Sequence, residues 1–127
     1  IGQIEATINS LNPTEIYIPH PSYNQDHQVV YDACLVALRP HDKNFFVKKA
    51  LVYEQPHAFL WGRYARDFSP SYFIPIDIEL KIKAYLLMET QVRSFRSPET
   101  IASMAQLRGA QSNHKHAEAF EVLRWTD

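Results

Sequence analysis

The sequence predicts an α/β fold with a small, mostly parallel sheet, and three observations support this prediction. Apolar residues recur at helical spacing in some segments and gather in short β-branched runs in others. These segments follow one another as helix, strand, helix and strand, with further helices after them, an order typical of α/β domains. The length of 127 residues, of which 46% are hydrophobic, indicates a single domain over residues 1–127 with a core of its own.

The first half of the chain predicts helices and strands in alternation. Aliphatic residues at helical spacing predict a helix over residues 1–11, and the β-rich run at 15–19 predicts a strand that ends at a proline. Asn24 is expected to cap a second helix over residues 26–39, and the run at 45–53 predicts a second strand. The face of the second helix that is expected to be buried comprises Val29, Val30, Ala33, Cys34, Ala37 and Leu38.

The second half is expected to be richer in helix. Residues 54–75 predict a long irregular loop crowded with aromatic side chains, which is functional or packed against a partner. Asp77 is expected to cap the next helix. Pro98 opens another helix, and Gly109 is placed just past its end. The alternating residues 120–125 predict a last strand at an edge of the sheet.

Composition excludes several classes of protein. The net charge is −1, from 13 basic and 14 acidic residues, so the basic surface of a nucleic-acid-binding protein is not expected. No apolar run approaches the ~20 residues of a membrane span, so no membrane partner is expected. A lone cysteine forms no internal disulfide, and a cytoplasmic location is expected.

The densest polar cluster, residues 24–27, lies between a predicted strand and a predicted helix. Ligands bind at the carboxyl ends of strands in open α/β sheets. His27 in a first helical turn, with Asp26 beside it, has the makings of a metal ligand and its partner. Helix capping uses the same residue types, so spacing alone favours the explanation of Asn24 and Asp26 as caps and of His27 as an exposed residue.

Other candidates lie near this cluster or beyond it. His20, at the start of the same loop, and Glu54, at the end of the second strand, are assigned to substrate binding. A structural bond from Glu54 to a nearby arginine is the alternative. Cys34 falls on an apolar helix face and is expected to be buried and inert. The following aromatic residues form either a sugar-stacking wall or core and interface packing: Trp61, Tyr64, Phe68, Tyr72 and Phe73.

Several short motifs occur in a characteristic order along the whole chain. They are Ile16–Pro21 leading into Asn24–His27, then Lys81–Ala84 with Glu89–Gln91, then Arg108-Gly109, and finally Ala117–Phe120. In this order the chain resembles the carboxyl-terminal part of the PIG-L/LmbE-like N-acetylglucosamine de-N-acetylases. The resemblance implies a Rossmann-like three-layer sandwich with a mostly parallel sheet, here an incomplete carboxyl-terminal portion, and a zinc hydrolase of N-acetylated sugars.

The resemblance also implies roles for individual residues. His27 matches the downstream metal ligand, and Asp26 matches the acidic residue before it, which is expected to orient the ligand. Asn24 stands where relatives have a histidine, and Met88 where many have another. Asn24 can donate a hydrogen bond to an oxyanion but cannot transfer a proton at neutral pH. The early His-Pro-Asp-Asp motif, which supplies two ligands and the base in the family, is absent from these residues.

The expected function is therefore that of an intact protein larger than this chain. It is the zinc-dependent removal of an acetyl group from an N-acetylglucosamine-type sugar, with the remaining zinc ligands supplied by an amino-terminal segment. The 127 residues alone are expected to be inactive, and to form a homo-oligomer or to associate with that segment. The alternative is a non-catalytic sugar-binding or oligomerisation module of the same fold.

Overall fold

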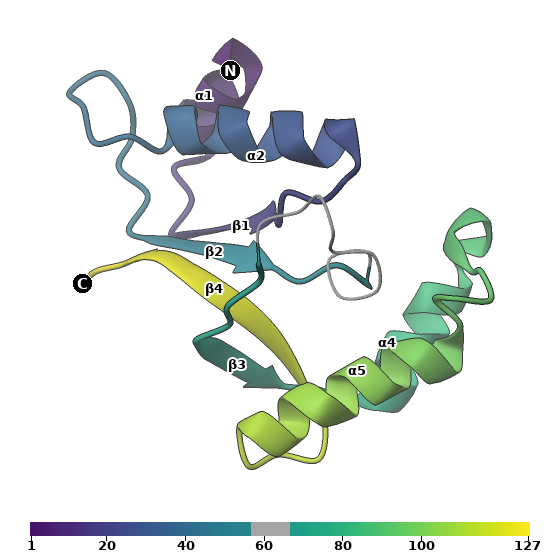
Figure 1. Cartoon of the computed structure of the whole chain (residues 1–127). Coiled ribbons are helices and arrows are strands. Elements are labelled where there is room, and N and C mark those ends of the chain that lie inside the picture. The colour runs from purple at the N-terminus through teal and green to yellow at the C-terminus, as the bar shows by residue number, and fades with distance from the viewer. Residues whose placement is uncertain (57–66) are drawn as a thin grey trace. The chain divides into compact units, whose positions relative to one another are not determined.

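Helices and strands alternate through the first half of the chain, and α4 and α5 follow in the second (Figure 1). The structure, a computed structural model, describes residues 1–56 and 67–127. Its elements are α1 (Gly2–Leu11), β1 (Glu15–Pro19), α2 (Gln25–Ala37), β2 (Lys49–Tyr53), β3 (Tyr72–Pro75), α4 (Ile78–Leu86), the short 3-10 helix η2 (Glu89–Gln91), α5 (Pro98–Gln111) and β4 (Ala117–Trp125). The predicted α/β class is confirmed.

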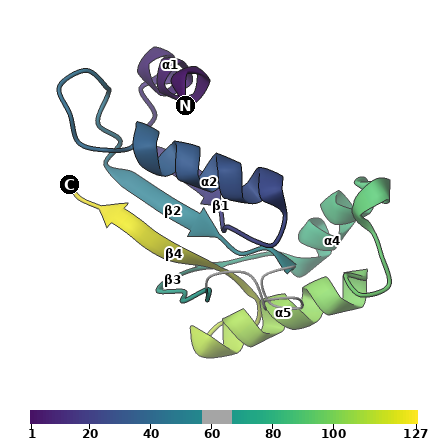
Figure 2. The ribbon, with the colours of Figure 1, turned by 45° about the horizontal axis from the view of Figure 1, so that its top comes forward.

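The described strands form a mixed sheet in the order β1-β2-β4-β3. β1 and β2 run parallel, with Tyr17 opposite Leu51, whereas β3 and β4 run antiparallel, with Phe73 opposite Ala119. The arrows of β2 and β4 also point in opposite directions (Figure 2). The prediction of a mostly parallel sheet is wrong, because the helical connection between β3 and β4 returns the chain antiparallel to the strand it left.

β4 is an inner strand of this sheet and not the predicted edge strand. It begins at Ala117, earlier than expected, and its first half is largely buried. Small and aromatic side chains at Ala117, Ala119 and Phe120 provide that burial. The alternation visible in residues 120–125 belongs only to the second half of the strand, which is why the sequence suggested an edge.

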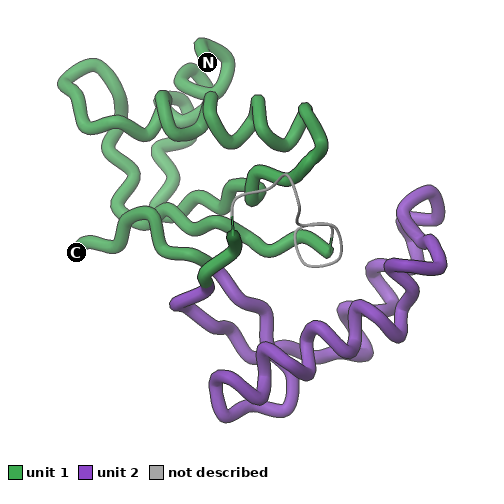
Figure 3. Tube along the Cα trace, viewed as in Figure 1, with its two compact units in different colours: residues 1–69, 121–127 green, residues 70–120 purple. Residues whose placement is uncertain are grey.

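The chain divides into two compact units (Figure 3). Unit 1 comprises residues 1–69 and 121–127, and unit 2 comprises residues 70–120. The first unit holds the parallel pair of strands with α1 and α2, and the second holds β3, α4 and α5. The division falls within β4, whose residues up to Phe120 belong to unit 2.

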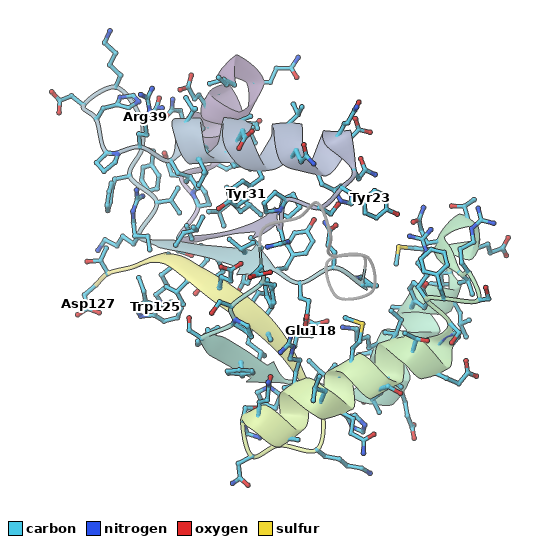
Figure 4. All side chains as sticks on the ribbon, viewed as in Figure 1. Tyr23, Tyr31, Arg39, Glu118, Trp125 and Asp127 are labelled. Atoms are coloured by element: carbon cyan, nitrogen blue, oxygen red, sulfur yellow. The ribbon has the colours of Figure 1, made fainter. Side chains whose placement is uncertain are left out.

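Unit 1 has its core between α2 and the parallel strands. Tyr31 and Cys34 of α2 pack with Ile18 of β1 and Val52 of β2, and Figure 4 shows Tyr31 pointing from the helix toward the strands. The prediction that Cys34 is buried is confirmed.

The first turns of α2 depart from the predicted buried face. Val29 and Val30 are 66% and 41% exposed, and the buried stripe runs through Tyr31 instead. A residue three positions before Cys34 lies on the same helix face, and the tyrosine ring fills that position. The two valines were placed on the buried face because they are aliphatic, so this end of the buried face was predicted wrongly.

The predicted helix caps are confirmed. The side chain of Asn24 accepts a hydrogen bond from the backbone N–H of Asp26, and that of Asp77 accepts from Glu79 and Leu80. Ser97 caps α5, with Pro98 as its first residue. Each cap satisfies backbone donors that have no partner within the helix.

Gly109 lies inside α5 and not just past its end, so this boundary was predicted wrongly. A Cβ atom built on Gly109 would come within 2.6 Å of the backbone oxygen of His114. A glycine is therefore needed at this position because the backbone that follows the helix passes too close to its last turn for a Cβ atom.

The two strand predictions in the middle of the chain also need correction. β3 lies within the segment 54–75 that was predicted to be irregular throughout, and it has aromatic residues of high strand propensity at Tyr72 and Phe73. β2 begins at Lys49, four residues later than expected. Phe46, before it, is exposed on one side and covered on the other by the guanidinium of Arg124, 4.3 Å from the ring centroid.

Within residues 1–56 and 67–127, none of the helices combines the length and the apolar character that a membrane crossing requires.

Candidate functional site

The candidate site lies in unit 1, where the two parallel strands end. Pro19 and Tyr53 are the last paired residues of β1 and β2. The backbone N–H of His20 donates to the carbonyl of Tyr53 over 3.2 Å, which ties the two strand exits together. His20 and Glu54 therefore leave neighbouring strands at the same edge of the sheet, the edge at which α/β proteins bind ligands.

His20 is fully buried and faces a carboxylate. Its Nε2 lies 3.6 Å from Oε1 of Glu121 on β4, whose side chain is 11% exposed. The ring of Phe68 meets the imidazole edge-on, with 5.3 Å between ring centroids. His20 thus lies in the interior beneath the loop, and its predicted contact with substrate stays a prediction.

Glu121 is a residue that the sequence interpretation missed. Its signal is a carboxylate between two apolar residues, Phe120 and Val122. Acidic residues are rarely buried unless they have a partner. That rule was available from the sequence, but the identity of the partner required the sheet order, since His20 lies about 100 positions away along the chain.

The loop after β1 is held together by Ser22. This residue is fully buried, and its Oγ lies 2.8 Å from Nδ1 of His27. The backbone N–H of Asn24 donates to the same oxygen over 3.1 Å, and Nε2 of Gln28 donates to the carbonyl of Ser22 over 2.6 Å. Ser22 therefore joins the loop to the first turn of α2.

His27 is the third residue of α2 and is partly buried, as a residue in the first helical turn. Its ring is held by Ser22, whereas the expected orienting residue, Asp26, is exposed and contributes its backbone N–H to the Asn24 cap. Within the described part of the chain, no hydrogen bond joins the Asp26 carboxylate to His27. Ser22 escaped notice because a serine in a polar loop gives no signal by itself.

His27 is the candidate metal ligand of this loop. Nδ1 of His27 is engaged by Ser22, and a hydrogen-bonded imidazole is the usual form of a metal ligand. Among the residues that the structure describes, no group of three His, Cys, Asp or Glu side chains is placed to hold a metal ion. The expected ligands from an amino-terminal segment stay a prediction.

The remaining candidates are dispersed. Glu54 is partly buried directly after β2. Of the aromatic residues, Phe68 packs on His20 in unit 1, while Tyr72 and Phe73 belong to β3 of unit 2. Trp61 and Tyr64 lie outside the described residues. The sugar-stacking wall therefore stays a prediction.

Unit 2 carries a separate groove along α4, which the sequence did not indicate. Its volume is about 490 Å³, within the range of small-ligand pockets. The groove is lined by Ile76, Asp77, Leu80, Lys81, Ala84, Tyr85, Met88 and Glu118. Lys81 pairs with Glu118 at 2.6 Å, and the hydroxyl of Tyr85 donates to the carbonyl of Arg96 at the same distance. These contacts fix the helix that forms one wall.

Comparison with known proteins shows the fold and leaves the family open. No protein-family profile matches the chain, and no curated protein matches it. The crystal structure of the conserved protein TT1542 from Thermus thermophilus is similar, with a TM-score of 0.74 and 18% sequence identity. The match covers 98% of this chain and 58% of that chain, so the chain spans less than two thirds of this structural relative.

Proposed function

We propose that the chain is part of a zinc-dependent hydrolase that removes the acetyl group from an N-acetylglucosamine-type sugar or glycoconjugate. The observation that carries the proposal is the position of His27. It lies in the first turn of α2, directly after the parallel strand β1, with its Nδ1 held by a buried hydroxyl. A histidine oriented in this way at this edge of a sheet suits metal binding.

The resemblance to PIG-L/LmbE-like deacetylases gives the proposal its reaction. A Rossmann-like architecture for the intact protein is part of the proposal, and the parallel pair β1 and β2, with α2 between them in sequence, supports it. An amino-terminal segment would supply the other ligands and the base. Homo-oligomer formation or association with that segment is proposed with it.

The residues of this chain have distinct tasks in such a reaction. Zinc, when bound, lowers the pKa of its water ligand to about 7 and polarises the acetyl carbonyl. His27 would hold the metal, with its ring fixed by Ser22. Asn24 uses its Oδ1 to cap α2, which leaves its Nδ2 to donate to an oxyanion. Glu54, beside the strand exits, is positioned to contact the sugar.

The test compares the intact protein with two variants. His27→Ala should remove stoichiometric zinc and acetate release from N-acetylglucosamine substrates. His114→Ala is the matched control, because His114 is an exposed histidine in unit 2. Zinc and turnover that survive His27→Ala would overturn the assignment of this ligand. An intact protein that contains neither would overturn the function itself.

The second candidate is a non-catalytic sugar-binding module. Asn24 favours it, because its side chain is already used as a helix cap and carries no transferable proton. Calorimetric titration separates the two candidates: a module binds N-acetylated sugars without releasing acetate, whether or not zinc is present. The enzyme releases acetate only with zinc.

A further inference from the structure

α4 of unit 2 carries two apolar faces, and one of them is uncovered in the structure as described. Ile78 and Ile82 are partly buried on the first face, and the helix packs against α5 (Figure 1). Leu80, Ala84 and Leu87 form the second face, because residues four and then three positions apart lie on one side of a helix. Leu80 and Leu87 are 64% and 82% exposed, so the second face is an apolar row open to solvent.

This apolar row adjoins the groove along α4. Leu80 and Ala84 belong to both, and Ile76 and Met88 line the groove as well. Single exposed leucines are common on protein surfaces, but a continuous apolar surface beside a hollow is typical of an interaction site. This side of α4 therefore presents a projecting side chain, Leu87, together with a depression that can receive one.

Charged residues beside the apolar row indicate which partner fits it. Glu79 and Lys83 lie one turn apart along one flank, with the acid nearer the start of the helix and the base nearer its end. Neither side chain makes an ion pair with another described residue, whereas Lys81 on the other flank pairs with Glu118 at 2.6 Å. The flank of Glu79 and Lys83 is matched by a helix that carries the same two charges in the opposite order.

We infer that this surface pairs with the same surface of a second copy of the chain, with the two α4 helices antiparallel about a two-fold axis. The reversal brings Glu79 of each copy opposite Lys83 of the other, so the ion pair forms twice. The two apolar rows then pack between the helices, and Leu87 of each copy meets the Ile76 end of the other copy's groove. Parallel helices would instead place like charges opposite each other.

The inference names the surface for the homo-oligomer formation proposed above and uses no residue of the candidate site in unit 1. It depends on that self-association and not on zinc binding or acetate release, so the two can fail separately. α4 has 10 residues or fewer to offer, being a helix of 9 residues, so the interface is small. The association should therefore be weak and should depend on protein concentration.

The test is sedimentation equilibrium of the intact protein over a range of concentrations in about 0.15 M salt. Glu79→Lys and Lys83→Glu, tested singly, should each weaken association about tenfold, because two opposite-charge contacts become like-charge contacts. An equimolar mixture of the two variants should associate nearly as strongly as the wild type, since the mixed pair restores opposite charges at both contacts. Mixing does not repair a helix that is destabilised within its own chain, so restoration separates pairing from folding.

Leu80→Glu tests the apolar row and should weaken association by about tenfold or more, because it places a charge at the centre of the interface. Leu11→Glu is the matched control. It makes the same substitution at an exposed leucine of α1 in unit 1, and it should associate as the wild type does.

An intact protein that stays monomeric at every concentration overturns the inference, whatever then covers α4. Association that is unchanged by Leu80→Glu also overturns it, since another surface is then used. Single charge variants that associate like the wild type, or whose mixture stays weak, contradict the antiparallel pairing. Zinc content and acetate release, measured on the same samples, decide the proposed function separately.

Discussion

The imidazole of His20 and the carboxylate of Glu121 meet inside unit 1, with 3.6 Å between Nε2 and Oε1. His20 follows β1 and Glu121 lies on β4, so the contact joins two strands that are far apart in sequence. Buried polar groups cost free energy unless they are matched. The pair therefore connects the loop after β1, where the candidate site lies, to strand β4.

Replacing Glu121 by alanine should lower the free energy of unfolding by about 2 kcal/mol, since it takes a polar partner away from a buried imidazole. Urea denaturation of the chain measures this loss. The double variant His20→Phe with Glu121→Leu should recover part of it, because neither replaced side chain then buries a polar atom. A coupling energy near zero in the double-mutant cycle of His20→Phe, Glu121→Leu and their combination would show that the two side chains act independently.

Gly109→Ala should destabilise unit 2. Alanine normally favours a helix over glycine by about 1 kcal/mol. At this position, however, its Cβ would lie 2.6 Å from the His114 oxygen and 2.7 Å from Lys115 backbone atoms. These are main-chain atoms, so the turn after α5 must shift, and we expect a loss of about 2 kcal/mol in place of a gain.

The matched control for this change is Gly2→Ala, because a Cβ on Gly2 meets no atom within 4 Å. It begins α1, where alanine should be neutral or slightly stabilising. Thermal melts of both variants provide the comparison. If Gly109→Ala melts at or above the wild-type temperature, the close approach of the two backbone segments is not maintained in solution.

Asp77→Ala should fray α4. In the structure as described, no residue of this helix is buried. The start of the helix therefore depends strongly on the Asp77 side chain, which accepts hydrogen bonds from the N–H groups of Glu79 and Leu80. Loss of a cap costs about 1 kcal/mol. Amide hydrogen exchange should therefore become roughly fivefold faster across α4. Asp77→Asn keeps a hydrogen-bond acceptor at the cap, so the amides of α4 should exchange almost as slowly in this variant as in the wild type. If they exchange as fast as in Asp77→Ala, the effect is due to the lost charge and not to the lost cap.

The sequence predicted those features that depend on neighbouring residues. The caps at Asn24 and Asp77 were visible because a polar residue precedes an apolar repeat, and both form as expected. The burial of Cys34 followed from the same periodicity. Local chemistry was enough in each case.

Features that depend on distant parts of the chain were missed. The requirement for Gly109 inside α5 arises from the chain crossing back over the helix, and the contact of Glu121 with His20 arises from the order of strands. The mixed sheet likewise depends on how the helical connection between β3 and β4 turns. Ser22 is an intermediate case: it is close to His27 in sequence, but only the loop conformation brings the two side chains together.

Cys34 provides the last prediction. Burial raises the pKa of the Cys34 thiol, because the thiolate is poorly solvated in the core between α2 and the parallel strands. The folded chain thus holds the thiol proton more tightly than the unfolded chain does. The stabilisation from this group is complete below the ordinary thiol pKa and declines as the pH rises above it.

We expect the free energy of unfolding to fall on the alkaline side of that value. At about pH 8, the native thiol should react with iodoacetamide at least tenfold more slowly than the thiol in 8 M urea. Mass spectrometry after timed quenching measures both rates. A native thiol that reacts as fast as the unfolded one would mean that this core opens readily, and that the packing of Cys34 against Ile18 and Val52 does not persist in solution.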